Sequence, residues 1–285
     1  MILTTGMTTN SPPKIHFIGA GNMTTSLVGG LLRQGYLPDH ISASDPSEAA
    51  RTRLSRQHGI TVFEDNHAGL KLADVVVLAV KPQHMHTVVT GLADSLASRS
   101  IPPVLLSIAA GITTGSIQRW AGISVPVVRC MPNTPAMIGQ GASGLFATEN
   151  VTESQQRAVL QIMRSVGQAW WLDTENQLDI VTAVSGSGPA YFFLFMQAIQ
   201  EAGESLGLPP EISRQLVLQT ARGAASLAMS SEVGLAQLRR QVTSPGGTTA
   251  AALETLSDHR FEEIVGQAVK AAWRRAGELS REFGD

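Results

Sequence analysis

Short apolar runs separated by helix-like stretches recur through the first half of this 285-residue chain. The runs are rich in β-branched residues and are bounded by Gly, Pro, Asp or Ser, features typical of strands. Near-continuous apolar strands joined by helices predict a mostly parallel sheet covered on both faces. The predicted strands are residues 15–18, 41–44, 60–62, 75–80, 104–108 and 127–130, with further edge strands at 142–146 and 169–172 around a helix at 153–166.

The apolar spacing changes to a helical period after residue 172. Helices are expected at 189–206, where Gly207 would cap the end, and from Pro210 onward. The second of these contains small residues at 223–226, which allow helices to approach closely. Shorter helices are expected at 235–241 and 249–256, and a last one at 261–283. The sequence therefore predicts an α/β fold with a tail at 1–13, a parallel-sheet domain at 14–172 and an all-helical domain at 173–285.

Composition excludes several classes of protein. Hydrophobic residues make up 43% of the chain, charged residues 15%, and the net charge is -2, so the chain is neither disordered nor built to attract nucleic acid or an anionic membrane. A single cysteine excludes an intrachain disulfide framework and fits a reducing cytosol. No uninterrupted apolar run reaches the roughly 18 residues of a spanning helix. Residues 1–13 lack the basic end and apolar stretch of a signal peptide, and we expect a loose tail there.

A glycine-rich turn follows the first predicted strand and opens a helical stretch at 26–32. Its sequence is Gly-Ala-Gly-Asn-Met-Thr at 19–24. Gly19 permits a tight turn, Gly21 has no Cβ to block a pyrophosphate, and the N–H groups at the helix start bind phosphates. Thr24 stands where the third glycine of the usual fingerprint would be. The alternative is an ordinary turn, but the position after the first strand favours a dinucleotide site.

Asp45 ends the second predicted strand, close to the expected offset from the glycine turn. There it could accept a hydrogen bond from a ribose 2′-hydroxyl, which favours NAD. Arg51 and Arg53 follow and could instead hold the 2′-phosphate of NADP. In the alternative interpretation, Asp45 caps a helix that begins at Pro46.

Four further segments carry a family resemblance. They are Ala-Val-Lys-Pro at 79–82, Arg-Cys-Met-Pro-Asn-Thr-Pro at 129–135, Ser-Gly-Ser-Gly-Pro-Ala-Tyr at 185–191 and Val-Thr-Ser-Pro-Gly-Gly-Thr-Thr at 242–249. Together with the glycine turn, they make the chain resemble the pyrroline-5-carboxylate reductase family from about residue 14 to 282. The Ser-Pro-Gly-Gly-Thr-Thr run is the most specific part.

The resemblance implies an oxidoreductase of the CH–NH class that reduces 1-pyrroline-5-carboxylate to L-proline with NADPH or NADH, the last step of proline biosynthesis. It favours NADPH, while Asp45, which stands where many relatives carry an uncharged residue, leaves NADH open. It also implies a Rossmann domain, a helical dimerisation domain, and a cytoplasmic homodimer assembled into a higher oligomer such as a decamer.

The predicted cofactor site includes the glycine turn and the ends of the predicted strands. Its residues are Gly19, Ala20, Gly21, Asn22, Met23, Ser44, Asp45, Pro46, Asn66, Ala79, Val80, Lys81, Pro82, Ala110 and Glu175. The predicted substrate site consists of Glu232, Gln241, Gly246, Gly247, Thr248 and Thr249. At Gln241, relatives often carry another residue.

Physical reasoning supports the substrate site separately. Glycines directly before a helix expose N–H donors to an anion, and the substrate carries a carboxylate. We expect the Thr249 hydroxyl to contact the ring nitrogen, as the catalytic group, with Glu232 as an outer charge or structural partner. The alternatives are a capped turn at 245–249 and a solvated loop acid at Glu232.

Two rival functions are a hydroxyacid dehydrogenase and a non-catalytic dinucleotide sensor. Alcohol oxidation needs a base, commonly Lys or His, in the helical domain. The only lysine after Lys81 is Lys270, and the only histidine after His86 is His259, which argues against the dehydrogenase. The glycine turn and the Thr248-Thr249 pair argue against the sensor.

No metal site is predicted. His84 and His86 are two residues apart and would face different sides of a helix. Cys130, at the end of a predicted strand, is expected to be a small buried hydrophobe.

Overall fold

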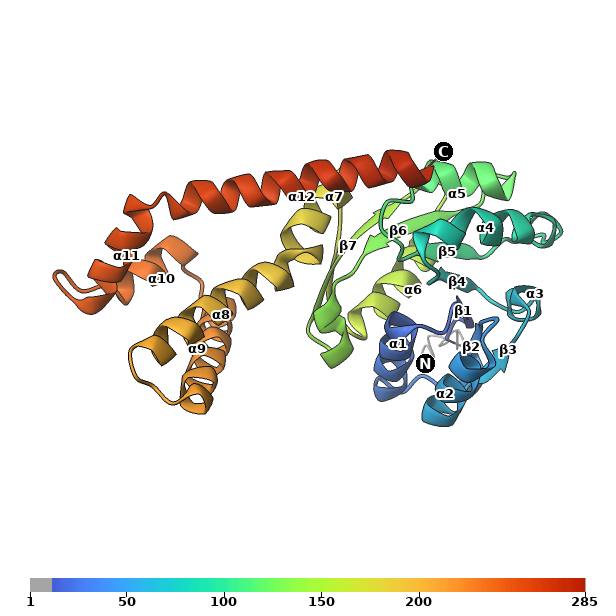
Figure 1. Cartoon of the computed structure of the whole chain (residues 1–285). Coiled ribbons are helices and arrows are strands. Elements are labelled where there is room, and N and C mark those ends of the chain that lie inside the picture. The colour runs from blue at the N-terminus through green and yellow to red at the C-terminus, as the bar shows by residue number, and fades with distance from the viewer. Residues whose placement is uncertain (1–11, 285) are drawn as a thin grey trace, which may run out of the picture. The chain divides into compact units, whose positions relative to one another are not determined.

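The computed structural model describes residues 12–284, so most of the predicted tail at 1–13 lies outside the described residues (Figure 1). By its internal contacts the chain divides into two compact units. The first comprises the residues up to Gly186 together with the segment that begins at Trp273, and the second is Ser187–Ala272.

The first unit contains an eight-stranded sheet of order β3-β2-β1-β4-β5-β6-β7-β8. All neighbouring pairs are parallel except β6 and β7, which confirms the predicted α/β class. β7 lies between β6 and β8, whereas the sequence suggested an edge strand. The strands are β1 Ile15–Ile18, β2 Ile41–Ser44, β3 Thr61–Phe63, β4 Val75–Leu78, β5 Val104–Ser107, β6 Val127–Met131, β7 Gly141–Ala147 and β8 Gly167–Trp171.

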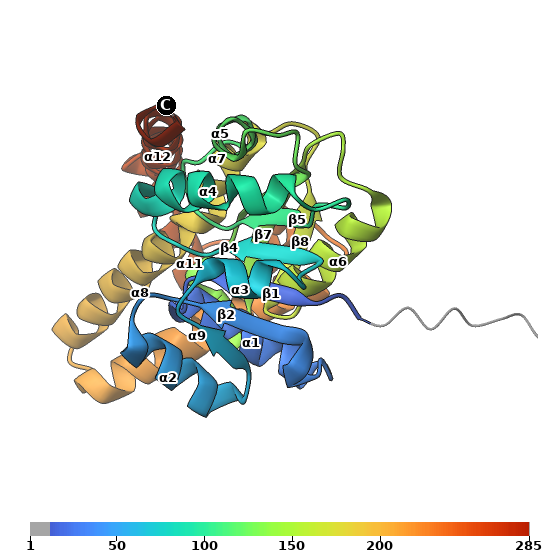
Figure 2. The ribbon, with the colours of Figure 1, turned by 90° about the vertical axis from the view of Figure 1, so that its right-hand side faces the viewer.

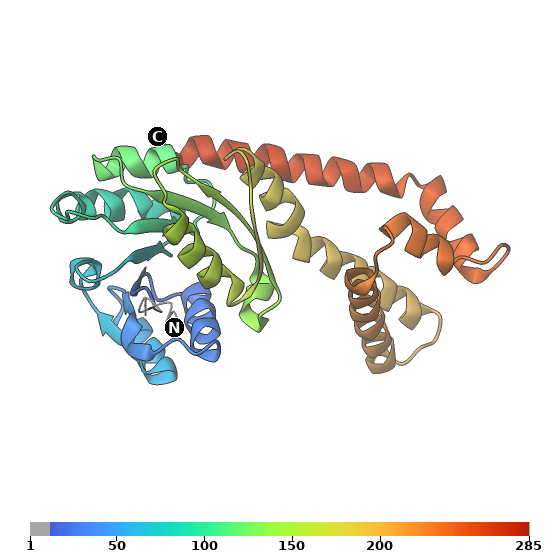
Figure 3. The same ribbon diagram turned by 180° about the vertical axis from the view of Figure 1, so that it is seen from behind.

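Helices cover both faces of the sheet, with α4 and α5 on one face and α1 and α2 on the other (Figure 2). α6 lies on the same face as α1 (Figure 3). The helices of this unit are α1 Asn22–Arg33, α2 Glu48–His58, α3 Asn66–Leu70, α4 Pro82–Ala97, α5 Thr114–Ala121, α6 Glu153–Arg164 and α7 Gln177–Val181. Their ends carry ordinary signals: α2 begins at the cap Ser47 and ends at left-handed Gly59, and α6 has a capping box formed by Thr152 and Gln155.

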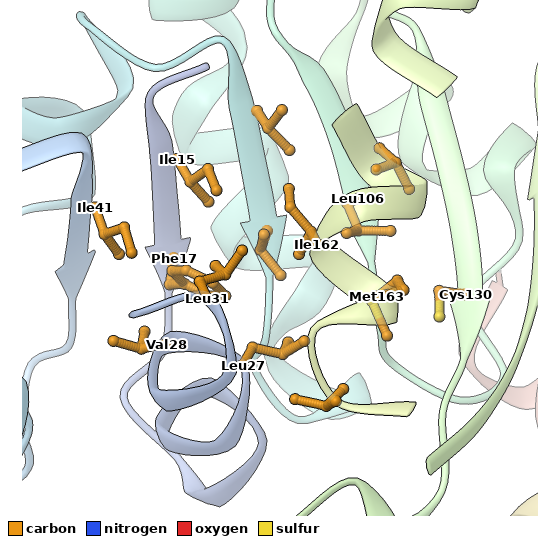
Figure 4. Packing of buried hydrophobic residues seen from close by; sticks show 14 of the residues in the cluster. Ile15, Phe17, Leu27, Val28, Leu31, Ile41, Leu106, Cys130, Ile162 and Met163 are labelled. Carbon is orange, nitrogen blue, oxygen red and sulfur yellow. The ribbon is translucent and has the colours of Figure 1, made fainter. Parts of the chain in front are cut away.

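Two apolar cores fill the spaces between the sheet and its helices. Ile15 and Phe17 of β1 pack with Leu27 and Leu31 of α1 in the first core, shown in Figure 4. Ile18 belongs to the second core, beneath α4 and α5. Because side chains alternate across a strand, β1 contributes to both cores, which explains why three of its four residues are apolar.

The register brings the carboxyl ends of four strands to one edge. Ile18 pairs with Ser44 on one side and with Leu78 on the other, and Leu78 pairs with Ser107. β1 lies between β2 and β4, so the strand order reverses beside it. In open parallel sheets, ligands bind outside the carboxyl ends of the strands at such a point.

The second unit is helical. Its helices are α8 Gly188–Ser205, α9 Pro210–Ser230, α10 Leu235–Gln241, α11 Thr248–Asp258 and the first part of α12 Phe261–Gly284. Ser213 Oγ of α9 donates to the Gln200 carbonyl of α8 at 2.9 Å. A Cβ on Gly203 would lie 2.7 Å from Ser213 Oγ, so glycine at this position lets the two helices approach.

Large apolar side chains of α8 and α9 are exposed in the single chain. Phe192 is 68% exposed, Leu194 69% and Met229 80%. The helical stretch Gln177–Ser205 is long and apolar enough to cross a membrane by length and composition, although its polar residues interrupt every apolar run. Length and composition do not distinguish a membrane span from an apolar helix that meets another protein chain.

The end of α12 returns to the first unit. The carbonyl of Gly284 accepts hydrogen bonds from Ser116 Oγ, at 2.7 Å, and from Arg119 Nη2, both on α5. Gly111, with φ of +76°, would place a Cβ 3.1 Å from the Leu279 carbonyl oxygen. The segment from Trp273 therefore packs against α5 as part of the first unit.

Candidate active site

The two glycines of the turn after β1 have different structural roles. Gly19 has φ of +106°, and a Cβ there would lie 2.7 Å from the Ala79 carbonyl oxygen, so the fold itself requires glycine. Gly21 has φ of −77°, and apart from its two chain neighbours a Cβ there would meet no other heavy atom of the described chain within 4 Å. The fold would accept a side chain at Gly21. Its absence leaves space directly in front of the helix start.

α1 begins at Asn22, four residues earlier than the sequence suggested, with Gly21 as its N-cap. Within residues 12–284, no side chain caps this helix start. The N–H groups of the first turn, including those of Asn22 and Met23, have no partner within the helix and are suited to an anion. Thr24, fully buried, donates from Oγ1 to the Gly19 carbonyl at 2.7 Å. Thr24 occupies the position of the third glycine in the usual fingerprint, and its hydroxyl stabilises the turn.

Asp45 follows β2 and holds the glycine turn. Its Oδ2 accepts from the Ala20 N–H at 2.8 Å, and its Oδ1 accepts from the Ser47 N–H at 2.8 Å. The helix-cap alternative was wrong: α2 begins at Glu48, not Pro46, and its cap is Ser47. The sequence could not reveal the contact to Ala20, because the two residues meet only through the pairing of β1 with β2.

Arg51 and Arg53 also bind the backbone around this turn. Arg51 Nη1 donates to the Asp45 carbonyl at 2.7 Å and to the Pro46 carbonyl at 3.0 Å. Arg53 Nη2 donates to the Ala20 carbonyl at 2.9 Å. Both guanidinium groups therefore lie beside the carboxyl ends of β1 and β2, each with further N–H donors.

Ser44 and Asn66 meet at the same edge. Ser44 Oγ donates to Asn66 Oδ1 at 2.7 Å, and the buried His16 of β1 contacts Ser44 Oγ through Nε2 at 3.1 Å. His16 was not singled out from the sequence. Its signal was a histidine in the centre of an otherwise apolar strand.

The remaining predicted cofactor residues of this edge follow β4 and β5. Ala79 and Val80 continue from β4, Lys81 is the N-cap of α4 and Pro82 is its first residue. Ala110 lies between β5 and α5. These residues come from the strand ends that the register aligns with Ile18.

Glu175 lies between β8 and α7 in the chain, and its side chain reaches the start of α5. Its two oxygens accept from the N–H and Oγ1 of Thr114, each at 2.8 Å. The buried Arg129 donates to Glu175 at 3.2 Å and to Asp179 at 3.3 Å. The sequence did not anticipate this ion-pair cluster, although an arginine within an apolar strand was its signal.

The predicted substrate residues belong to the second unit. Gly246 has φ of +70°, and the Gly247 N–H donates to the Ser244 carbonyl at 3.1 Å, which forms a tight turn. Gly247 is the N-cap of α11, so Thr248 and Thr249 open the helix, and no side chain of the described residues caps it. The capped-turn alternative therefore lacks a capping side chain.

Glu232 and Gln241 both precede this turn in the chain. Glu232 is exposed in the segment between α9 and α10, and Gln241 is the exposed last residue of α10. Neither forms a side-chain hydrogen bond within the part of the chain that the structure describes.

Residues 12–284 contain no cluster of side chains that could bind a metal ion, and their one cysteine is buried. No group of three His, Cys, Asp or Glu side chains within residues 12–284 could hold a metal ion. His86 packs edge-on against Trp120, with ring centroids 5.3 Å apart. Cys130 is buried, and burial raises the pKa of its thiol, so it stays protonated and unreactive.

Comparisons with known protein families cover both units. Residues 175–279 match the family model for pyrroline-5-carboxylate reductase dimerisation. Residues 14–111 match the family model described as NADP oxidoreductase, coenzyme F420-dependent. The two matches fall on the two halves of the chain that the sequence separated.

Relatives match over nearly the whole chain. The pyrroline-5-carboxylate reductase of Pseudomonas aeruginosa is 52% identical over 96% of this chain and 99% of its own length. That of Vibrio alginolyticus is 44% identical over 95% of this chain and 98% of its own.

Solved structures give the same result. The pyrroline-5-carboxylate reductase of Coxiella burnetii superposes with a TM-score of 0.90 at 43% identity, covering 94% of this chain and 99% of that one. The Plasmodium falciparum pyrroline carboxylate reductase, solved with NADP bound, has a TM-score of 0.82 at 30% identity, covering 94% and 98%.

Proposed function

The chain belongs to the pyrroline-5-carboxylate reductase family, and we propose that it reduces 1-pyrroline-5-carboxylate to L-proline with NADH or NADPH, the last step of proline biosynthesis. One observation in the structure carries the proposal. Each unit has a helix start capped by a glycine instead of a side chain, α1 at Gly21 and α11 at Gly247. Uncapped helix starts bind anions, and the reaction brings together two anionic groups, a pyrophosphate and a carboxylate.

The first unit offers the residues that fit a dinucleotide. The nicotinamide, when bound, supplies the hydride. The N–H groups of Asn22 and Met23 would hold the pyrophosphate in the space that Gly21 leaves open. Asp45 and the guanidinium groups of Arg51 and Arg53 lie beside the ribose end of this site, and they are compatible with either cofactor.

The second unit would hold the substrate. We assign the substrate carboxylate to the N–H groups that open α11 and to the Thr248 hydroxyl. We assign Thr249 Oγ1 to the ring nitrogen, which must be protonated or hydrogen-bonded while its neighbouring carbon accepts the hydride. Glu232 would act as an outer charge, and Gln241 would line the site from the end of α10.

The rival functions have little support. In Ser187–Ala272 the only Lys and His are Lys270 and His259, and His259 Nδ1 contacts the Thr255 carbonyl of its own helix at 2.9 Å. A hydroxyacid dehydrogenase would need a base there. A dinucleotide sensor would not need a second anion site at the start of α11.

The domain division follows from the same proposal. We take 14–172 as the dinucleotide-binding domain and 173–285 as the substrate and dimerisation domain, which agrees with the start of the dimerisation match at residue 175. Contacts alone draw the boundary later, at Ser187, because α7 packs against β7 of the sheet.

The dimerisation domain makes the protein a homo-oligomer. Exposed phenylalanine and leucine side chains on α8 and α9 are the surface that a second copy would cover. We further propose that dimers assemble into a larger ring such as a decamer, that the enzyme works in the cytoplasm without membrane or nucleic-acid partners, and that the neighbouring subunit completes each site.

The test is an absorbance assay of reduced nicotinamide consumption. We expect turnover with pyrroline-5-carboxylate and none with hydroxy acids and NAD(P)⁺. Oxidation of a hydroxy acid would support the dehydrogenase, and dinucleotide binding without imine turnover would support the sensor.

Mixing two impaired variants, Gly21→Val and Thr249→Ala, at a cofactor concentration where each alone has little activity, tests whether subunits share a site. If they do, reassembled hybrids regain part of the activity, because some sites then combine two intact halves. If each chain forms its own site, mixing restores nothing.

A further inference from the structure

His16 is a completely buried histidine in the centre of β1. Register places it opposite Ser42 of β2, and its ring contacts two serine hydroxyls of that strand: Nδ1 lies 2.9 Å from Ser42 Oγ and Nε2 lies 3.1 Å from Ser44 Oγ. A buried polar ring persists only when its nitrogens are hydrogen-bonded. Both ring nitrogens of His16 are hydrogen-bonded. The contact of Nε2 is with Ser44, a residue of the predicted cofactor site.

The protons in this chain of contacts can be assigned. Ser44 Oγ donates its one proton to Asn66 Oδ1 at 2.7 Å, so it must accept from His16 Nε2–H. A neutral imidazole has one N–H, and therefore Nδ1 accepts from the Ser42 hydroxyl. Burial lowers the pKa of His16 to about 4, which keeps the ring neutral at ordinary pH. The hydrogen bonds thus run in one direction, from Ser42 through His16 and Ser44 to Asn66.

The last hydrogen bond of this series, from Ser44 to Asn66, fixes the orientation of the Asn66 side-chain amide. Because Asn66 Oδ1 faces Ser44, its Nδ2 group faces the other way. Asn66 is partly exposed at the first position of α3, and its Nδ2 meets no hydrogen-bond acceptor among residues 12–284. Without Ser44 the amide could flip and present oxygen in place of nitrogen, since the two ends have nearly the same shape.

The surrounding backbone is built around the imidazole. Gly69 of α3 lies against the ring so closely that a Cβ there would come within 2.0 Å of His16 Nδ1. The ring of Phe63, at the end of β3, lies 6.2 Å from the ring of His16. Glycine at position 69 therefore lets α3, which carries Asn66, rest directly on the histidine.

We infer that His16 is a positioning residue for the cofactor: through Ser44 it holds the Asn66 amide so that Nδ2 donates to an oxygen on the ribose end of the dinucleotide. This inference rests on the proposed function. The acceptor is either a 2′-hydroxyl or a 2′-phosphate oxygen, and both lie at the carboxyl end of the second strand in this fold.

The main test compares His16→Phe with His16→Gln by dinucleotide titration. Phenylalanine keeps the ring volume but cannot donate to Ser44, whereas glutamine carries an N–H near the position of Nε2. One hydrogen bond of ordinary strength corresponds to a few-fold to about tenfold in affinity. We expect the Kd to rise by that factor in His16→Phe and to be largely restored in His16→Gln, with kcat at saturating cofactor unchanged.

A double-mutant cycle with Ser44→Ala tests whether His16 acts on Asn66 through Ser44. If His16 acts through Ser44, adding His16→Phe to Ser44→Ala raises the Kd no further. Independent, additive effects would overturn the inference. Nitrogen chemical shifts of His16 supply a second readout that needs no ligand: we expect the Nε2–H tautomer, and an Nδ1–H tautomer would overturn the proton assignment.

Asn66→Leu keeps the shape of the side chain and removes the outward amide nitrogen without adding a charge, so it remains informative if His16→Phe does not fold. Comparison of NADPH with NADH identifies the acceptor. A loss confined to NADPH assigns the 2′-phosphate, equal losses assign the ribose hydroxyl, and no loss with either overturns the inference. Parent protein that fails to reduce the imine would refute the proposed function instead, so the two failures are distinguishable.

Discussion

Replacing Gly21 with valine should abolish tight cofactor binding while leaving the fold intact. The backbone at Gly21 has φ of −77° and ψ of −174°, a conformation that valine adopts readily. Apart from Gly21 itself and its two chain neighbours, a Cβ there would meet no heavy atom of residues 12–284 within 4 Å. The new side chain would therefore occupy the space in front of Asn22 and Met23 without disturbing its own neighbours.

In Gly21→Val, the expected loss of stability is small and the expected loss of cofactor affinity is large, so the two effects can be measured separately. Valine is a poorer N-cap than glycine, which costs about 0.5–1 kcal/mol of stability, and in a protein of this size 1 kcal/mol corresponds to roughly 2–4 °C in Tm. Losing one N–H contact to the pyrophosphate costs about 1.5–3 kcal/mol, which corresponds to a Kd roughly 10 to 100 times higher.

Gly19→Ala is the matched control, two residues away in the same turn. Its φ of +106° and the 2.7 Å approach to the Ala79 carbonyl oxygen forbid a side chain. Strain of this kind costs about 1–3 kcal/mol, before the displacement of β4 is counted. We expect Gly19→Ala to lower the thermal midpoint by several degrees.

The assay is dinucleotide titration by fluorescence on purified parent and variant proteins, beside thermal unfolding of each. Undiminished NADPH and NADH affinity in Gly21→Val would refute the placement of the pyrophosphate. A thermal midpoint lowered as far in Gly21→Val as in Gly19→Ala would refute the argument that only Gly19 is demanded by the fold.

Four further predictions concern single side chains. Thr249→Ala should lower kcat/KM about tenfold or more, with Thr249→Ser close to the parent, because a hydrogen bond to a charged group is worth about 1.5–3 kcal/mol; steady-state kinetics at equal stability decide this. Asp45→Ser should shift the ratio of catalytic efficiencies toward NADPH and weaken both cofactors, since the carboxylate also accepts from the Ala20 N–H; an unchanged ratio would leave Asp45 a purely structural role. Arg129→Met should lower the free energy of unfolding by about 3–5 kcal/mol in urea titrations, because it leaves two carboxylates without their shared cation; a loss below 1 kcal/mol, a value on the order of a surface ion pair, would contradict this. His16, with a folded-state pKa of about 4 against 6.5 when unfolded, should make stability fall as pH drops through that window, because only the unfolded state takes up the proton; the pH slope of the parent should exceed that of His16→Gln.

Local sequence patterns were sufficient to locate the strands of the sheet domain to within a few residues, but only some of its helices. β-Branched runs such as 75–80 became β4, and the glycine turn marked the start of α1. The direction of β7 was not predictable in this way, because antiparallel pairing with β6 depends on the short connection through Thr134–Ile138 and not on the apolar pattern of the strand itself.

Most side-chain contacts around the candidate site could not be predicted from the sequence. Asp45 and Ala20 are 25 residues apart, and Arg129 and Glu175 are 46 apart. Such pairs form only once sheet register has brought the strand ends together. The sequence could predict a cofactor role for Asp45, but it could not reveal that the carboxylate accepts from two backbone N–H groups.

The return of α12 to the first unit has a consequence for how the protein is made. The strands of the first unit precede Ser187–Ala272 in the chain, whereas the segment that packs on α5 follows it. At roughly 5–20 residues per second of synthesis, the nascent sheet domain waits several seconds with Ser116 and Gly111 lacking their final neighbours. The helical unit, which is one continuous stretch, can be complete before the sheet domain is. A chain that ended at Ala272 would therefore contain all of the second unit but only part of the first.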